Sequence, residues 1–275
     1  MAREVMDQDR PSRLTALALA FLALIWVSPF FWLMTNAIDP AATGQLEVPQ
    51  SIGIDNFVQA LSGSAGRQFV NSMLIAAGTA TLTVVVAISA AYPLSRMRIP
   101  GRNAFLWALV LLRMLPATGV IVPMYFAAQA AGLLNMMGIV LALTILNLPF
   151  TLLLLKNFFD TVPIELEEAA YVEGASLWTI LIKIVLPLSK AGIAVVWFFS
   201  FTGAWNEFLL PLIFSRTEAG FPMSIGLYSA FGRQGSIDYG FLAAFSIIYA
   251  APAVGVYFLL RRNMNTGFAG VGVKG

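Results

Sequence analysis

Few residues in this 275-residue chain could carry out chemistry, because most catalytic and metal-binding side chains are missing. The sequence contains no Cys and no His. Disulfides, thiolate or imidazole metal sites, cysteine nucleophiles and a Ser-His-Asp triad therefore lack their parts. The sequence also has no G-x-x-x-x-G-K-[ST] phosphate loop, which is the usual cradle for ATP. We predict no catalytic residue and no metal ligand, and so a protein that is not an enzyme.

The acidic side chains that could form a binding site fall in two places. Glu165, Glu167 and Glu168 lie together between two apolar runs, whereas Glu207 follows Asn206 inside the apolar stretch AWNEFLLPL. A charged side chain at the centre of a bilayer costs about 2.5 to 3.5 kcal/mol, so it is a functional candidate by default. Glu207 and Asn206 could line a translocation pathway, or they could hold helices together.

Asn147, Arg113 and the tryptophans of the apolar runs each have two possible interpretations. Asn147, in LNLPF, could form a hydrogen bond between helices or contact a ligand. Arg113 could pair with Glu207, but residue counts along their helices place them at heights that differ by about 10 Å, so we do not expect this pair. Aromatic rings could stack on a sugar, but anchoring at the membrane interface is the favoured interpretation for Trp26, Trp32, Trp107, Trp197 and Trp205.

The elements that position these residues follow from composition. Hydrophobic residues make up 59% of the chain and charged residues 11%, against about 45 to 50% and 25% in soluble domains. A bilayer needs about 20 apolar residues per helix. We therefore predict an all-α, polytopic membrane protein with one domain, 14–262, and tails 1–13 and 263–275. Its six transmembrane helices are expected at Leu14–Met34, Phe69–Leu94, Ala104–Ala128, Gly138–Leu155, Ala191–Phe214 and Gly240–Leu260.

The orientation follows from Lys and Arg, which are concentrated in cytoplasmic loops. Twelve of these 16 residues lie on the side of the termini, Arg113 lies inside a span, and only Arg67, Arg216 and Arg233 lie opposite. Both termini and loop 156–190 are thus predicted to be cytoplasmic, and loops 37–68 and 215–239 to be outside. The net charge of +2 and the absence of a basic stripe do not suggest a nucleic acid partner.

Loop 156–190 is expected to form two helices separated by a sharp bend. Thr161 is a candidate cap for the first helix, whose early turns carry the three acids where the helix dipole favours them. Gly174 can adopt the left-handed conformation that ends many helices. Ser176 can then cap a second helix over Leu177–Val185, and Pro187 is expected to halt it.

Seven residues of this loop have the spacing of a known signature: EAA, three residues, G, nine residues, I, one residue, LP. They are Glu168, Ala169, Ala170, Gly174, Ile184, Leu186 and Pro187. On these residues the chain resembles the permeases of bacterial ABC importers. LSRMRIPGRN, LNLPF, FFDTVPIELEEAA, AWNEFLLPLIF and GFAGVGVKG are also similar to the maltose-type carbohydrate permeases, specifically to the six-helix partner of a heterodimeric pair.

The resemblance implies an ABC type I importer permease fold in the bacterial cytoplasmic membrane. It implies a second homologous permease, two ATP-binding subunits and an extracytoplasmic solute-binding protein as partners, besides membrane lipid and a carbohydrate substrate such as a sugar, glycoside or polyol. The seven residues would belong to a coupling helix that docks into the ATPase, with Glu168 facing a basic residue. ATP and Mg would bind to the ATPase, and this chain would bind no cofactor.

One outer loop and the cytoplasmic C-terminal tail complete the expectation. Loop 215–239 is expected to contact the binding protein, and the tail 267–275 to reach the ATPase dimer. The alternative function is an ion-coupled secondary carrier, which would need paired intramembrane carboxylates or a His relay. An intramembrane enzyme is a further rival, although only one carboxylate lies in the bilayer.

Overall fold

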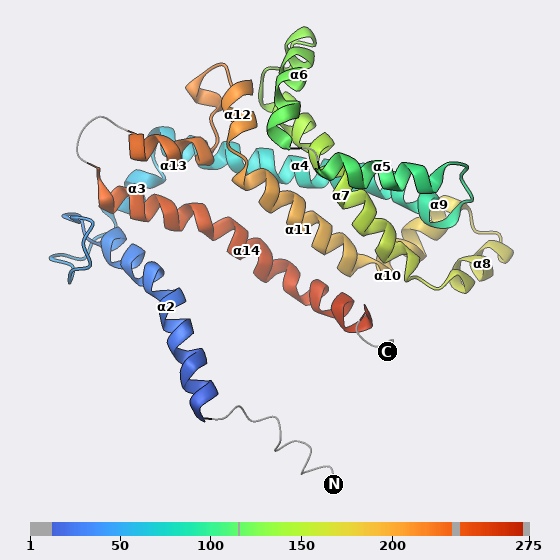
Figure 1. Ribbon diagram of the computed structural model, residues 1–275, viewed down its shortest axis with the longest axis horizontal. Coiled ribbons are helices and arrows are strands. Elements are labelled where there is room, and N and C mark those ends of the chain that lie inside the picture. The colour runs from blue at the N-terminus through green and yellow to red at the C-terminus, as the bar shows by residue number, and fades with distance from the viewer. Residues whose placement is uncertain (1–12, 115, 233–236, 272–275) are drawn as a thin grey trace. The chain divides into compact units, whose positions relative to one another are not determined.

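A computed structural model describes residues 13–114, 116–232 and 237–271, which form helices joined by loops and turns, without a strand among them (Figure 1). The all-α prediction is thus confirmed. The helices are α2 (Arg13–Ile38), α3 (Asp55–Ala60), α4 (Gly63–Arg96), α5 (Arg102–Met114), α6 (Ala117–Ala130), α7 (Met136–Asp160), α8 (Ile164–Val172), α9 (Leu177–Ile180), α10 (Leu186–Leu188), α11 (Lys190–Asn206), α12 (Leu209–Phe214), α13 (Met223–Gly232) and α14 (Tyr239–Val271), with a π-helical turn η1 (Leu181–Val185) and a 3-10 turn η2 (Glu218–Gly220).

The helices include enough long apolar segments for a multi-pass membrane protein. Among the described residues, α2, α4, α7 and α14 are long and apolar enough to span a membrane, and the number rises to six if two bent pairs each count as one span. Helix α14 also continues to Val271, beyond the predicted boundary at 262. Charges mark where a helix leaves the membrane, but its backbone hydrogen bonds need not stop there.

Two predicted spans are interrupted. Ala104–Ala128 is divided into α5 and α6 on either side of residue 115, and Pro116 precedes α6 as its cap residue. Ala191–Phe214 is divided at Glu207, between α11 and α12. Proline lacks an N–H and crowds the carbonyl four residues earlier. For Pro211 that carbonyl belongs to Glu207, which therefore has no donor four residues later within the helix; Pro93, Pro149 and Pro252, in contrast, lie inside continuous helices.

The chain divides into two compact units. The first contains residues up to Ser62 and 230–248. In this unit the amide of the buried Asn56 donates to the carbonyls of Ala37 and Asp39, at 3.1 and 3.0 Å. The indole of Trp32 donates to the carbonyl of Gly44 at 3.1 Å. These bonds give the predicted outer loop 37–68 a fixed path.

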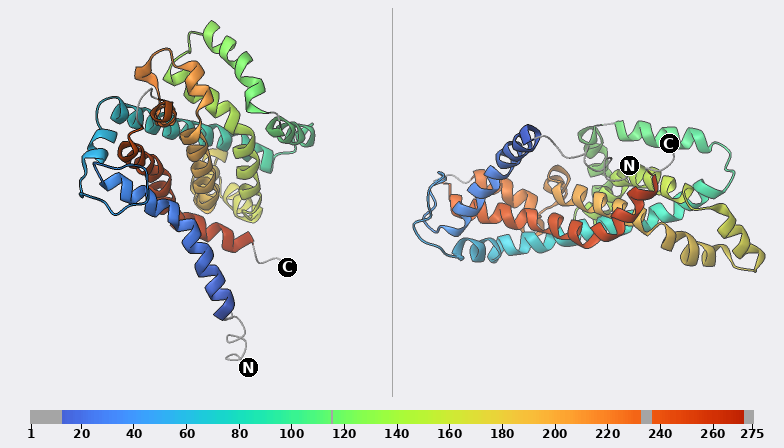
Figure 2. Two further views of the ribbon diagram at one scale, coloured as in Figure 1. Left: turned by 60° about the vertical axis from the view of Figure 1, so that its left-hand side comes forward. Right: turned by 90° about the horizontal axis from the view of Figure 1, so that it is seen from below.

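The second unit contains residues 63–229 and those from Tyr249 onward. Helices α4, α7 and α11 pack side by side in it (Figures 1 and 2). Helix α11 comes close to α7 at Gly192, where an added Cβ would collide with the ring of Phe158 on α7. At one end of the unit the apolar core extends to residues that follow the predicted bend. Its buried residues include Ala91, Leu155, Phe159, Ile180, Leu181 and Val185.

The predicted bend is present in loop 156–190. Helix α8 ends at Val172, and Gly174 follows with φ +86°. The hydroxyl of Ser176 accepts from the Thr179 N–H at 3.2 Å and caps α9, as predicted. Figure 2 shows α8 and α9 projecting at one end of the second unit.

Two details of this loop differ from the prediction. Thr161 does not cap α8, because its hydroxyl donates to the carbonyl of Phe158 at 2.7 Å at the end of α7, and Pro163 takes the cap position. Pro187 does not halt the second helix. It lies in the first turn of α10, where the missing N–H is tolerated, and the chain bends by 78° only between α10 and α11.

Candidate functional site

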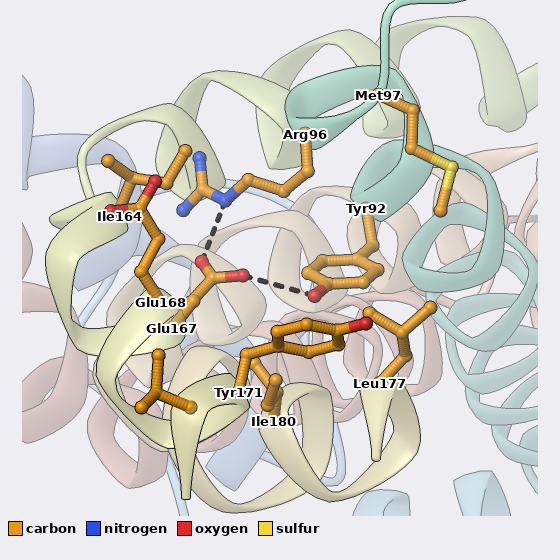
Figure 3. Close-up of a pocket in the computed structure, with 10 residues that line it drawn as sticks. Tyr92, Arg96, Met97, Ile164, Glu167, Glu168, Tyr171, Leu177 and Ile180 are labelled. Carbon is orange, nitrogen blue, oxygen red and sulfur yellow. Dashed lines mark hydrogen bonds and ion pairs between the residues drawn. The ribbon is translucent and has the colours of Figure 1, made fainter. Parts of the chain in front are cut away.

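The site that the signature predicts is built around α8 and α9 at the end of α4. A cavity of about 520 Å³ opens there between the three helices. Figure 3 shows its side chains, which are mainly apolar around a small charged centre. It is lined by Tyr92, Arg96, Met97, Ile164, Glu167, Glu168, Tyr171, Val172, Leu177 and Ile180.

The two adjacent acids of α8 have different environments. Neighbouring residues on an α-helix point about 100° apart, so Glu167 and Glu168 can have different burial although both line the cavity. Glu167 is buried, whereas Glu168 is exposed, as is Glu165 one turn earlier. The segment thus presents one face to α4 and another to the surroundings.

The buried face is held by an ion pair. The Glu167 carboxylate accepts from Arg96 Nε at 2.7 Å and from the Tyr92 hydroxyl at 3.0 Å (Figure 3). The side chains of Arg96 and Glu167 are only 12% and 8% exposed. A buried charge is strongly unfavourable unless it is paired and hydrogen-bonded, and this carboxylate meets both conditions.

Arg96 also donates hydrogen bonds to carbonyl groups at the end of α7 and just after it. Its guanidinium donates to the carbonyls of Phe159 and Val162, at 2.9 and 3.0 Å. The last carbonyls of a helix have no partner within the helix, so one side chain of α4 satisfies the end of α7 and the linker that leads into α8. We call Tyr92, Arg96 and Glu167 the α8 anchor.

A second polar contact extends the anchor along α7. The Ser95 hydroxyl donates to Asp160 at 2.6 Å and accepts from Arg96 at 3.0 Å. Asp160 also forms an ion pair with Lys156 one turn earlier on α7. The ends of α4 and α7 and the start of α8 are therefore joined by one continuous polar network.

The exposed face combines an acid with apolar side chains. In the described part of the chain, the Glu168 carboxylate has no hydrogen-bond or ion-pair partner. Its surroundings include Tyr171, Val172, Leu177 and Trp178, which are exposed by 51 to 88%. Exposed apolar patches with a polar rim are typical of protein interaction sites.

The seven signature residues divide into three groups by environment. Glu168 and Ala169 lie on the exposed face, and Gly174 forms the bend. No atom lies within 4 Å of a Cβ added to Gly174, so glycine is needed for its positive φ and not for space. Ala170, Ile184 and Leu186 are partly buried, while Pro187 is exposed.

Glu207 has a structural role in the break between α11 and α12. Its Oε1 accepts from the N–H groups of Leu209 and Leu210, at 3.1 and 3.2 Å. Its main-chain carbonyl, which Pro211 cannot satisfy, accepts from the Ser224 hydroxyl at 2.8 Å. The side chain of Glu207 thus accepts hydrogen bonds from the first turn of α12, and its backbone carbonyl accepts one from α13.

The two predicted asparagines bond mainly within their own helices. Asn147 donates to the carbonyl of Leu143 at 2.8 Å and not to another helix. Its oxygen lies 3.4 Å from the position of a Cβ on Gly203. Asn206 is exposed; its amide donates to the carbonyl of Thr202 in the same helix at 2.8 Å, and its oxygen accepts from the hydroxyl of Tyr249 on α14 at 3.1 Å.

Trp205 is a core residue and not an interfacial anchor. It is only 2% exposed, and its ring stacks with that of Phe201 at 5.8 Å. Its indole N–H donates to the carbonyl of Tyr249 at 3.0 Å. Trp26 and Trp107, in contrast, are largely exposed, as anchoring side chains should be.

The α8 anchor is the part of the site that sequence reasoning missed. Arg96 and Glu167 are separated by 71 residues, so no local pattern pairs them. One signal was present nevertheless: the neighbouring side chains of the doublet Glu167-Glu168 leave the helix in different directions, so one acid can be buried while the other is exposed. The sequence could not name the partner of the buried acid, because both Arg96 and Lys156 lie at the ends of predicted spans.

The fold and the site define a helical, multi-pass membrane component with a bent two-helix segment that suits docking to another protein. Residues 83–268 match the family described as binding-protein-dependent transport system inner membrane component. The chain belongs to this family, and it is a transport subunit and not an enzyme.

Individual relatives agree with this assignment. The chain is 30% identical to the diacetylchitobiose uptake system permease protein NgcG of Streptomyces coelicolor, over 96% of this chain and 90% of that protein. It is 30% identical to the galactooligosaccharides transport system permease protein GanQ of Bacillus subtilis, over 94% of each. A bacterial ABC transporter that imports alginate has the same fold, with a TM-score of 0.79, 22% identity, and coverage of 90% of this chain and 94% of that chain.

Proposed function

We propose that this chain is a permease subunit of an ABC importer for a carbohydrate, either a sugar, a glycoside or a polyol. The proposal is supported by the names of its relatives, whose substrates include diacetylchitobiose and galactooligosaccharides. Transport would proceed by alternating access, driven by ATP hydrolysis in a separate subunit that holds ATP and Mg.

The observation that carries the proposal is the division of α8 into a buried and an exposed face. The exposed face carries Glu165 and Glu168 beside the bend at Gly174, with an apolar surround. An ATPase groove with Arg or Lys would complement both the charge and the apolar rim. The buried face holds the segment in place while it is docked.

The remaining partners follow from the same proposal. The chain would pair with a second homologous permease and two ATP-binding subunits, and it would receive substrate from an extracytoplasmic binding protein. The Lys and Arg distribution supports cytoplasmic termini and a cytoplasmic loop 156–190. In loop 215–239, the proposed contact with the binding protein, residues 233–236 lie outside the described residues. So does the end of the proposed ATPase-contacting tail, 272–275.

The translocation pathway is the least defined part of the proposal. Asn206 remains a candidate residue because its side chain is exposed, with bonds to Thr202 and Tyr249. Glu207 and Asn147 also remain candidates, and each forms hydrogen bonds within the chain through one of its side-chain polar atoms.

The test is uptake by the complete complex in proteoliposomes. The chain is co-purified with its partner permease and ATPase, and the binding protein encoded nearby is loaded with members of a sugar panel. We expect vanadate-sensitive sugar uptake that requires ATP and the binding protein and that persists when ionophores collapse ion gradients. Uptake that follows the ion gradient without ATP would instead establish the ion-coupled carrier.

A further inference from the structure

Helix α4 holds a proposed functional segment at each of its ends. The α8 anchor lies at its C-terminal end. Near its N-terminal end, the Asn71 amide donates to the carbonyls of Ala219 and Phe221, at 2.8 and 3.0 Å. The Ser72 hydroxyl accepts from the N–H of Met223 at 2.7 Å, where α13 begins. We call Asn71 and Ser72 the α13 clamp.

The helix between the clamp and the anchor is continuous, although Pro93 removes one hydrogen bond near its C-terminal end. It runs as one α-helix from Gly63 to Arg96, and at 1.5 Å per residue Ser72 and Arg96 are about 36 Å apart along its axis. One face of it is buried throughout against α7 and α11. A packed helix of this kind moves as a unit more readily than it deforms.

Helix α8, in contrast, is short and joins α7 through only a brief linker. It has nine residues, fewer than an isolated helix needs to be stable in water. Most of its side chains are exposed, and Glu167 is its one fully buried residue. The anchor therefore provides the main polar hold on α8, and the same Arg96 holds the linker carbonyl of Val162.

From these contacts we infer that Tyr92, Arg96 and Glu167 are positioning residues that couple α8 to α4, so that movement of the docked segment passes along α4 to the α13 clamp. This inference rests on the proposed function, because it assigns a path between the ATPase and the outer loop. It separates the roles of the two adjacent acids: Glu168 binds the ATPase, and Glu167 transmits its movement.

The first test measures sugar imported per ATP hydrolysed in the purified, reconstituted complex. Glu167→Gln keeps the size of the side chain but removes its charge. We expect the ATPase to co-purify in parental amounts and the ratio to fall at least threefold. Glu173→Gln, at an exposed carboxylate in the same segment, should leave the ratio unchanged. Asn71→Ala, at the other end of α4, should lower the stimulation of hydrolysis by the loaded binding protein.

A second test restores the link by a different chemistry. Because the chain has no Cys, the double variant Arg96→Cys with Glu167→Cys can be joined by a short bis-maleimide, with a cysteine-free partner complex. The unlinked double variant should be uncoupled, and the cross-linked one should regain most of the parental ratio. This recovery separates positioning from simple loss of folding.

The outcomes discriminate between the two proposals. If Glu167→Gln retains the parental ratio, or if cross-linking fails to raise the ratio of the double variant, the inference is wrong. If Asn71→Ala retains full stimulation, the path along α4 is wrong. If the parental complex itself shows no ATP-dependent uptake with any sugar, the proposed function fails first.

Discussion

Replacing Glu207 by Ala removes both hydrogen bonds that its side chain makes at the start of α12. The N–H groups of Leu209 and Leu210 then lose their acceptor, whereas the bond from Ser224 to the main-chain carbonyl of residue 207 can remain. Loss of a helix cap costs about 0.5 to 2 kcal/mol, and each hydrogen bond to a charged group contributes about 1.5 to 3 kcal/mol. Since the site is only partly buried, we expect a loss of about 2 kcal/mol.

Thermal unfolding in detergent, followed by tryptophan fluorescence, measures this loss. For a chain of this size, about 2 kcal/mol corresponds to a fall in Tm of about 4 to 8 °C. Glu207→Gln keeps an acceptor oxygen in place, so its Tm should fall by less than half as much. Transport by the Gln variant should stay near the parental rate if capping is the main role of Glu207.

Two results would refute this reasoning. If Glu207→Ala melts within about 1 °C of the parent, against the fall expected from the size scaling, the two N–H groups do not depend on this carboxylate. If Glu207→Gln keeps its Tm but loses transport, the charge acts in the translocation pathway, and capping is secondary.

The remaining predictions concern the docking face and two glycines. Glu168→Lys should weaken ATPase docking by about 2 to 5 kcal/mol if its partner is basic and partly desolvated, and so reduce the amount of ATPase that co-purifies. Glu165→Lys serves as the neighbouring control. Transport at the parental rate by Glu168→Lys would contradict the docking role. Gly192→Ala should cost about 1 to 3 kcal/mol through overpacking against Phe158, seen as a lower Tm. Gly174→Ala should lower the free energy of unfolding by about 1 to 2 kcal/mol, because residue 174 has a left-handed conformation. Gly174→Asn should lower it by less. Equal Tm values for the two variants would argue against backbone strain.

Features with a local cause could be predicted from the sequence. The apolar runs indicated the multi-pass fold because the length of a membrane helix is fixed by the bilayer. Gly174 and Ser176 were placed correctly because a positive φ and a helix cap depend on a few neighbouring residues. The exposed position of Glu168 followed from the same short segment.

Features that depend on distant contacts could not be predicted. The pairing of Arg96 with Glu167 requires the ends of α4 and α7 to lie together, which only the packed helices determine. Hydropathy could not place the break at Glu207, because it measures how apolar a segment is and not whether its hydrogen bonds continue. Pro211 indicated a kink near Glu207, since it removes the donor for the Glu207 carbonyl, but prolines also lie inside the continuous helices α4, α7 and α14.

The π-helical turn over Leu181–Val185 allows the coupling segment to hold one residue more than a regular α-helix would. In this turn the Leu186 N–H bonds to the carbonyl of Leu181, five residues earlier, so the turn holds one residue more than an α-helical turn. Five residues of a π turn and four of an α-helix rotate the chain by nearly the same angle. A variant that lacks one residue of this turn would therefore form a regular α-helix, with Leu186 still packed against the core and the 78° bend into α11 nearly unchanged. The signature spacing from Gly174 to Pro187 is thus one residue longer than a regular helix would need.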